Sequence, residues 1–400
     1  MNKRIFAGIL GLVITASCVF IEDAKGYAWL ECKSSDDPYT WDGKYIKWYA
    51  GTNSFKSGSS RRTALVRALG RWNQAPGGFT YSDSVYWNDT SVSRTNKNTE
   101  VWFSNTLASG SATCYTDYYC LGNKEYIKKA DIVFDNAVSW SYTTNQFSKE
   151  ATFINSYTGN VYGGSRRSFV TTALHEMGHA LGLLHENRRL NIMGQDMSHL
   201  HANAGKIRAY VGEDAVNGEI YLYGMTGNIL KEDLSVSHWK FWKKGGTDNE
   251  YSLHILTKMY YVNSGNVVSG NWAEEIGVDG LGVRLYKVKK GTSYKVQFTY
   301  ENNGYYDLSG VKVGFYISSN NNITTMDYRF DSRTFTLTRD RPFTKKLTLT
   351  IPSNMTVLGQ TFPLTVGQIY WLGVIVDYKN SILEFSEDNN AAYLAIKIIP

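Results

Sequence analysis

The sequence predicts a multidomain protein in which an α+β domain, a twisted mixed sheet with one helix that carries the candidate site, is followed by an all-β sandwich. Three observations support this prediction. The chain has 400 residues, which is long for one ordinary hydrophobic core. Helix-period and strand-period apolar patterns mix up to about residue 223, whereas strand-like runs dominate from residue 286 onward. Aromatic residues make up 14% of the chain, which suits pleated sheets.

The first 28 residues are predicted to be a secretory signal peptide. A basic start at residues 1–4 precedes an uncharged apolar run over residues 5–21, and a small residue, Ala28, suits a cleavage site. Cys18 leaves a lipid anchor open as an alternative. No later segment has the ~20 apolar residues needed to span a bilayer. We therefore expect a secreted, extracellular protein without a transmembrane helix.

The net charge of +6 is mildly basic, and Lys and Arg are spread along the chain. A nucleic-acid-binding face has denser basic clusters, so we expect no nucleic-acid partner. An oxidising compartment favours disulfides, and Cys114 and Cys120, which flank a Tyr-rich stretch, are predicted to form one. Cys32 is then left over. It is free, pairs with one of the other two, is removed on maturation, or caps a metal ion as an inhibitory thiolate.

Helix and strand signals alternate through residues 29–223. Apolar positions at helical spacing predict a first helix that starts near Ser59 and stops before Pro76. A second helix is expected over residues 168–181, and short strands are expected at residues 44–49, 79–81, 100–104 and 130–134. Residues 224–285 carry a weaker signal and are expected to be a connecting region that is partly β.

The most informative stretch runs from His175 to His185 and has the pattern His-Glu-x-x-His-x-x-Gly-x-x-His. At ~100° per residue, His175 and His179 lie one turn apart on the same face of the second helix, so both imidazoles can reach one ion. Gly182 tolerates the positive φ that ends a helix, after which the chain can bring His185 back. Three imidazoles with an open fourth position predict a catalytic zinc site, because structural zinc ions have four protein ligands.

Glu176 is the predicted catalytic base. Its carboxylate lies beside the histidine pair, where it can reach a zinc-bound water without binding the ion. Zinc acidifies that water and polarises the scissile carbonyl, while Glu176 takes the proton and passes it to the leaving amine. The predicted activity is hydrolysis of peptide bonds in a protein or peptide substrate.

These residues resemble the signature of the metzincin metallopeptidases. That family has a Met-containing turn beneath the metal, and Met193 stands in its place, eight residues after His185, a spacing similar to that of the matrixin branch. The resemblance covers roughly residues 40–223 and implies a structural role for Met193, beside the ligands and base assigned above. It also implies that substrate lies along a sheet edge, for which residues 131–134 are the expected strand.

Several features depart from the matrixin pattern. The Cys-containing pro-segment that keeps those enzymes latent has no counterpart, and Gly194 stands where the Met-turn normally continues to Pro. A structural calcium ion or a second zinc ion stays unassigned. The remaining histidines are interpreted as surface residues or as residues with satisfied hydrogen bonds, in preference to metal ligands: His199, His201, His238 and His254. His199 and His201 are the strongest candidates for another role, because they lie two residues apart and close after the Met-turn.

Residues 286–400 predict the sandwich, because β-branched and aromatic runs are separated by Asn-rich turns. Residues 370–377 and 384–390 resemble CARDB, a bacterial adhesion-type Ig-like module. The acidic run at 384–390 is interpreted as turns in preference to a calcium site. The resemblance implies an extracellular or surface ligand for this module, or a spacing role.

Two classes of function follow. The first is a secreted zinc endopeptidase with an accessory sandwich for binding or spacing. The alternative is an exported adhesin or binding protein with a secondary or silent peptidase domain. The intact motif favours the enzyme, since a binding protein has no need of Glu176.

Overall fold

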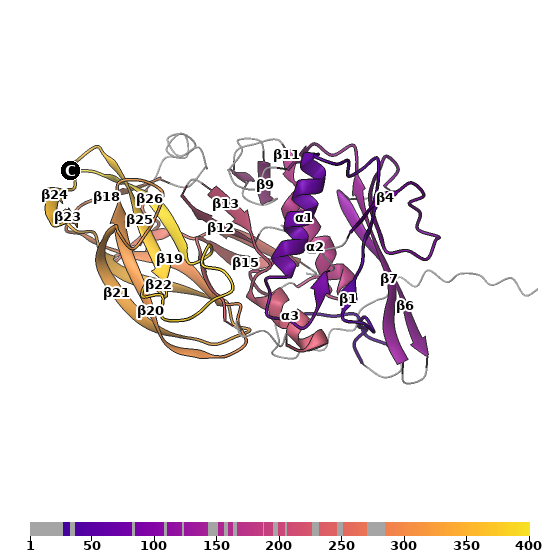
Figure 1. Cartoon of the computed structure of the whole chain (residues 1–400). Coiled ribbons are helices and arrows are strands. Elements are labelled where there is room, and N and C mark those ends of the chain that lie inside the picture. Colours follow the sequence, from indigo (N-terminus) through magenta and orange to yellow (C-terminus); the bar gives the residue numbers. More distant parts are fainter. Residues whose placement is uncertain are drawn as a thin grey trace, which may run out of the picture.

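The structure is a computed structural model that describes residues 27–32, 37–81, 85–107, 110–121, 124–142, 151–155, 159–162, 166–186, 188–194, 199–204, 206–225, 232–245, 251–269 and 285–400. All but the last two residues of the expected signal peptide lie outside these ranges. The described residues hold three helices: α1 (Ser60–Trp72), α2 (Phe169–Ala180) and α3 (Glu213–Tyr223). None of these helices is both long enough and apolar enough to cross a membrane. The helices lie between the N-terminal strands and the C-terminal sandwich (Figure 1).

A five-stranded mixed sheet organises the N-terminal half, with the order β4-β2-β5-β7-β6. Its strands are β2 (Tyr49–Gly51), β4 (Tyr86–Asp89), β5 (Glu100–Ser104), β6 (Ala112–Leu121) and β7 (Lys124–Asp135). All pairs are parallel except β6 with β7, which is antiparallel and leaves β6 at the edge. The prediction that residues 131–134 form the edge is therefore wrong, because they lie in β7, which is paired on both sides.

Smaller strand groups complete this half. β1 (Tyr45–Ile46) pairs with β3 (Thr80–Tyr81), and β12 (Leu200–Asn203) forms a hairpin with β13 (Lys206–Ala209). A further four-stranded sheet contains β8 (Trp140–Ser141), β9 (Ala151–Asn155), β10 (Gly159–Tyr162) and β11 (Arg166–Ser168).

The first two helices follow from the sequence. Ser59 caps α1, since its hydroxyl accepts the Arg62 N–H at 3.3 Å, and the helix buries one apolar stripe. Trp72, the last residue of α1, donates its indole N–H to the carbonyl of Leu174 in α2 at 3.0 Å. All but one of the residues of α2 are buried, so it is a core helix. α1 and α2 thus form one packed layer on the sheet.

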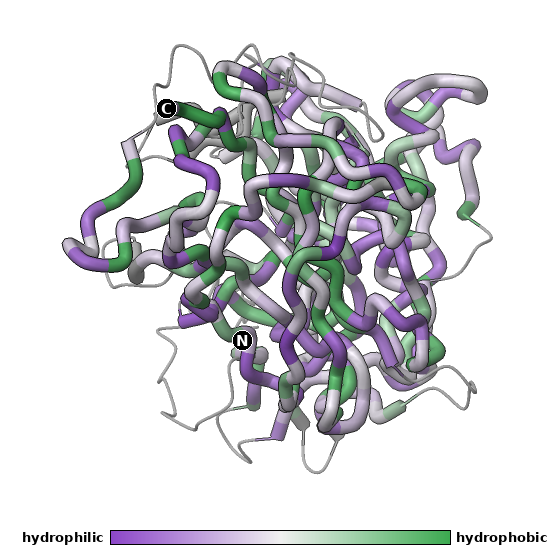
Figure 2. The backbone as a smooth tube through the Cα atoms, turned by 90° about the vertical axis from the view of Figure 1, so that its left-hand side faces the viewer, coloured by the Kyte–Doolittle hydropathy of each residue, from purple (hydrophilic) through white to green (hydrophobic). Residues whose placement is uncertain are grey.

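The C-terminal sandwich has two main sheets around one apolar core. The first has the order β18-β26-β25-β20-β21, and in the second β19 pairs with β14, β17 and β22. The strands of these sheets are β14 (Leu234–Ser237), β17 (Met259–Tyr261), β18 (Leu285–Val288), β19 (Ser293–Asn302), β20 (Leu308–Ser318), β21 (Tyr328–Leu337), β22 (Phe343–Thr350), β25 (Ile369–Val376) and β26 (Ala391–Ile398). Two hairpins accompany them: β15 (Trp239–Gly245) with β16 (Tyr251–Leu256), and β23 (Asn354–Val357) with β24 (Gln360–Pro363). Seen from this end of the molecule, apolar and polar stretches alternate along the chain (Figure 2), which is typical of strands with one buried face.

The segment 224–285 does more than connect the two parts. β14 and β17 both lie within it, and both pair antiparallel with β19 of the sandwich. The sandwich therefore draws on residues before 286, and its second sheet is completed by strands next to the N-terminal domain.

The disulfide joins Cys32 to Cys120, and Cys114 is free. The predicted bond between Cys114 and Cys120 is wrong because both residues lie on β6. Six residues of extended strand span roughly 20 Å, whereas bridged Cα atoms lie within about 7 Å of each other. The Cα atoms of Cys32 and Cys120 are 5.9 Å apart. This bond also rules out Cys32 as an inhibitory thiolate.

Candidate metal centre

Three imidazole nitrogens converge at the end of α2. The Nε2 atom of His179 lies 3.1 Å from that of His175 and 3.2 Å from that of His185, and the remaining pair is also 3.2 Å apart. A tetrahedral zinc ion with Zn–N bonds of about 2.0–2.1 Å separates its ligand nitrogens by roughly 3.4 Å. The triangle therefore has the size that one zinc ion requires.

The proton positions on two of these rings also suit a metal. The Nδ1 atom of His175 lies 2.8 Å from the carbonyl oxygen of Ile192, and that of His179 lies 2.8 Å from the carbonyl oxygen of Leu183. A carbonyl oxygen only accepts, so each Nδ1 carries the proton and each Nε2 keeps its lone pair. Burial lowers the pKa of all three imidazoles, that of His185 to about 3. Three neutral nitrogen donors therefore face one point.

Gly182 turns the chain so that the third ligand can return. Its φ is +100°, and a Cβ added there would lie 2.9 Å from the carbonyl oxygen of Tyr39, so both conformation and space require glycine. The N-terminal segment then holds the turn. Leu30 donates its N–H to the Gly182 carbonyl at 2.8 Å, and the Leu184 N–H donates to the Ala28 carbonyl at 2.9 Å.

Glu176 lies between α2 and the edge strand β6. Its carboxylate accepts a hydrogen bond from the backbone N–H of Cys114, and the positive charge of Arg167 also acts on it. Burial raises the pKa of Glu176 to about 7, against the lowering effect of these two neighbours. A carboxyl group with this pKa can both take up and release a proton near neutral pH. Sequence reasoning missed the Cys114 N–H, because a backbone donor leaves no residue-type signal.

Met193 packs directly under the helix. A Cβ added to Gly178 of α2 would lie 2.3 Å from the Met193 sulfur, so the thioether occupies the space that a side chain at 178 would need. The residue before it, Ile192, accepts the His175 hydrogen bond described above. The Glu186 N–H donates to the Met193 carbonyl at 3.3 Å. The turn thus contacts both the helix and the segment that carries His185.

The other four histidines are all buried, so a surface position is wrong for them: His199, His201, His238 and His254. The acidic run 384–390 is also partly internal. Asn390 donates to the Glu384 carboxylate at 3.0 Å, and Asn389 donates to that of Asp233 at 3.1 Å. These side chains therefore fix buried carboxyl groups where β14 meets the sandwich.

Two family models match the chain. Residues 40–224 match the peptidase family described as Matrixin (Peptidase_M10), and residues 278–393 match CARDB. The chain joins a matrixin domain to a CARDB domain. The matrixin domain indicates a zinc metallopeptidase that acts on protein, and the three converging histidines fit the metal that this family implies.

Similar solved structures include the crystal structure of the CARDB domain of the PF1109 protein from Pyrococcus furiosus in complex with di-metal ions. It is 14% identical, with a TM-score of 0.23, over 43% of this chain and 95% of that chain. A solution NMR structure of the same domain is 18% identical, with a TM-score of 0.20, over 28% of this chain and 85% of that one. No curated protein matches the chain.

Proposed function

We propose that the chain is a secreted zinc endopeptidase in which His175, His179 and His185 hold the ion and Glu176 is the general base. The observation that carries the proposal is the triangle of Nε2 atoms, 3.1–3.2 Å apart, within a matrixin domain. Zinc bound there supplies a Lewis acid that polarises the scissile carbonyl and acidifies the attacking water. Met193 supports the site from below.

Glu176 moves the proton. Its carboxylate accepts a proton from the attacking water and then delivers it to the amine that leaves. The hydrogen bond from the Cys114 N–H fixes the position of the carboxylate relative to β6. No side chain forms a covalent bond with the substrate, so water adds directly to the carbonyl, the amine then leaves, and the products are an acid and an amine without an acyl-enzyme.

The edge strand β6 supports an extended peptide as substrate. β6 pairs with β7 on one side, and no described strand pairs with its other side. An unpaired strand edge offers backbone N–H and C=O groups that can bind a peptide as an added strand. Because Cys114 lies on β6 and touches Glu176, a peptide bound along this edge would pass the general base.

Secretion rests on the expected signal peptide at residues 1–28, with a lipid anchor at Cys18 as the alternative. We divide the mature chain into a peptidase domain at 29–223, a partly β connecting region at 224–285 and a sandwich at 286–400. A role for the CARDB domain in binding an extracellular ligand is part of this proposal, and its similarity to adhesion-type modules supports it.

The test is cleavage of casein by the purified, zinc-loaded protein, with and without a chelator. The Glu176→Gln variant should keep its zinc and lose activity by about 10²–10⁴-fold, the usual contribution of general base catalysis. Glu387→Gln is a matched change in the sandwich, where the carboxylate accepts the Asn390 amide and no other donor among the residues that the structure describes, and this variant should cleave normally. Near-normal turnover by Glu176→Gln would refute the assigned base. Zinc-loaded wild-type protein that cleaves nothing would favour the adhesin.

A further inference from the structure

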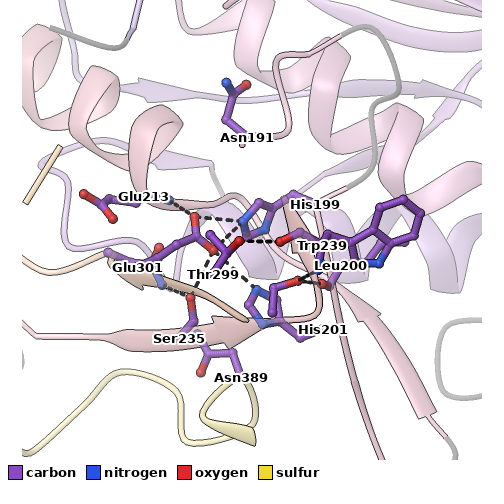
Figure 3. Close-up of polar contacts among 12 residues, drawn as sticks. Asn191, His199, Leu200, His201, Glu213, Ser235, Trp239, Thr299, Glu301 and Asn389 are labelled. Carbon is purple, nitrogen blue, oxygen red and sulfur yellow. Dashed lines mark hydrogen bonds and ion pairs between the residues drawn. The ribbon is translucent and has the colours of Figure 1, made fainter. Parts of the chain in front are cut away.

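A second group of metal-ligating side chains lies at the junction of the two domains, outside the catalytic centre (Figure 3). His199 and His201 belong to the segment that enters β12, and Glu301 comes from β19, 102 residues beyond His199. The Nε2 atom of His199 lies 2.8 Å from Oε2 of Glu301, and that of His201 lies 3.8 Å from the same oxygen. All three side chains are at most 2% exposed. Their ligand atoms lie within 4.8 Å of one another.

The proton position on His201 is the first argument for a cation here. Its Nδ1 atom lies 2.8 Å from the carbonyl oxygen of Val236, so Nδ1 carries the proton and Nε2 keeps a lone pair. That Nε2 atom is buried and has no hydrogen-bond partner among the described residues. It faces the Glu301 carboxylate at 3.8 Å, which is too long for a hydrogen bond. The His201 Nε2 atom and the Glu301 carboxylate are both acceptors, and a cation bound between them would explain why they face each other at this distance.

The distances also match the metal geometry at the catalytic centre. The ring centroids of His199 and His201 are 5.1 Å apart, as are those of His175 and His185. Ligand atoms around tetrahedral zinc are separated by roughly 3.4 Å. The 3.8 Å between the His201 Nε2 and Glu301 is close to this figure, whereas the 2.8 Å between the His199 Nε2 and Glu301 is a hydrogen-bond distance that a bound ion would lengthen. Gly212 leaves room for His199, because a Cβ there would lie 2.7 Å from the imidazole.

Charge is the third argument. Glu301 and its neighbour Glu213 are both buried, and the ion pairs of Glu301 within the described structure are with the two histidines only. Glu213 is already engaged, since its carboxylate accepts the backbone N–H groups of Asn302 and Arg341. Burial and the charge of Glu301 raise the pKa of Glu213, which favours its neutral form, so Glu301 is the charged group of the cluster. One carboxylate and two imidazoles in a dry interior are complementary to a divalent cation.

We propose that His199, His201 and Glu301 bind a second zinc ion, which links the matrixin domain to the CARDB domain. Two imidazoles and one carboxylate are a donor set that zinc accepts, whereas calcium and magnesium prefer oxygen ligands alone. The Val236 carbonyl orients His201 in the way that outer hydrogen bonds orient metal-binding imidazoles.

The test is metal analysis of the whole protein by inductively coupled plasma mass spectrometry, after saturation with Zn2+ and gel filtration. Wild type should hold two zinc ions per chain. His201→Ala and Glu301→Gln should each hold one and should still cleave casein, whereas His175→Ala should hold one and be inactive. Glu213→Gln is the matched control, because the Glu213 carboxylate accepts backbone N–H groups and is not one of the proposed ligands. This variant should keep two zinc ions.

The wild-type protein alone keeps the proposal open to refutation, even where a variant fails to fold. One zinc ion per saturated wild-type chain would show that the cluster is a metal-free ion pair and would overturn the proposal. A second equivalent of another metal in place of zinc would overturn it as well. Substitution with Co2+ gives an independent readout, since His201→Ala should lose about half of the visible absorption of tetrahedral Co2+ in the wild type.

Discussion

Removal of the disulfide between Cys32 and Cys120 should lower the stability of the matrixin domain considerably. The bond connects the N-terminal segment to β6, and the same segment pairs with the turn at Gly182 through the Leu30 N–H. The perturbation is the double variant Cys32→Ser/Cys120→Ser. In this variant the N-terminal segment that pairs with the turn at Gly182 loses its disulfide cross-link to β6.

The magnitude follows from the length of chain that the bond closes. Its two cysteines are 88 residues apart in sequence, and the chain-entropy relation gives about 4.6 kcal/mol for a loop of this length. For a domain of this size each kcal/mol shifts the unfolding temperature by about 2–4 °C. The double variant should therefore unfold roughly 9–18 °C below the wild type.

The assay is thermal unfolding followed by circular dichroism, with and without a reductant. Reductant should lower the unfolding temperature of the wild type by the same amount and leave the double variant unchanged, because Cys120 is exposed and can be reduced. Cys114→Ala is the matched control, since it removes the free thiol and should still respond to reductant. A double variant within 2 °C of the wild type would refute this reasoning, as would a Cys114→Ala protein that no longer responds.

Two further predictions concern the sandwich and its junction with the matrixin domain. Burial raises the pKa of Asp233 to about 7, and burial together with the charge of Asp233 raises that of Glu384 to about 9. The stability that these groups contribute is therefore complete below about pH 4 and is lost as pH rises through these values. The unfolding temperature should accordingly fall between pH 5 and 9, and Asp233→Asn should flatten the part between pH 5 and 7; an unchanged profile would contradict the assignment. Arg339→Ala should cost about 1–3 kcal/mol, measured by urea unfolding, because its guanidinium donates to buried Asn217 across the junction. Arg333→Ala, which breaks a more exposed pair, should cost less than about 1 kcal/mol, and equal losses would contradict this prediction.

The sequence could predict the parts of this structure that depend on local pattern. Apolar spacing identified α1, which buries residues at helical intervals. The spacing from His175 to His185, which begins on α2, contains the whole triangle of Nε2 atoms. Gly182 was identifiable because a helix that must stop and turn needs a residue with positive φ. In each case the residues that form the pattern lie within about three helical turns of one another along the chain.

The parts that escaped prediction depend on contacts between distant segments. Cys32 reaches Cys120 only because the N-terminal segment crosses the end of β6, and no local spacing encodes that crossing. β7 pairs with β5 on one side and with β6 on the other, so β6 is the edge strand. Residues 131–134, which were expected at the edge, therefore lie inside the sheet. Glu301 and His199 are 102 residues apart in sequence, so no local pattern could predict that they are in contact in the folded protein.

The same long-range contacts make the sandwich part of the framework of the catalytic site. α3 begins at Gly212, which has no capping side chain, and the Glu301 carboxylate of the sandwich accepts the Glu213 N–H at 3.3 Å in its place. At the other end of α3 the Tyr223 hydroxyl donates to the Leu181 carbonyl at 2.6 Å, next to the turn that returns His185 to the metal. A spacer would leave the start of α3 exposed to water, whereas here it is buried against β19. The CARDB domain therefore stabilises the helix that supports the turn leading to His185.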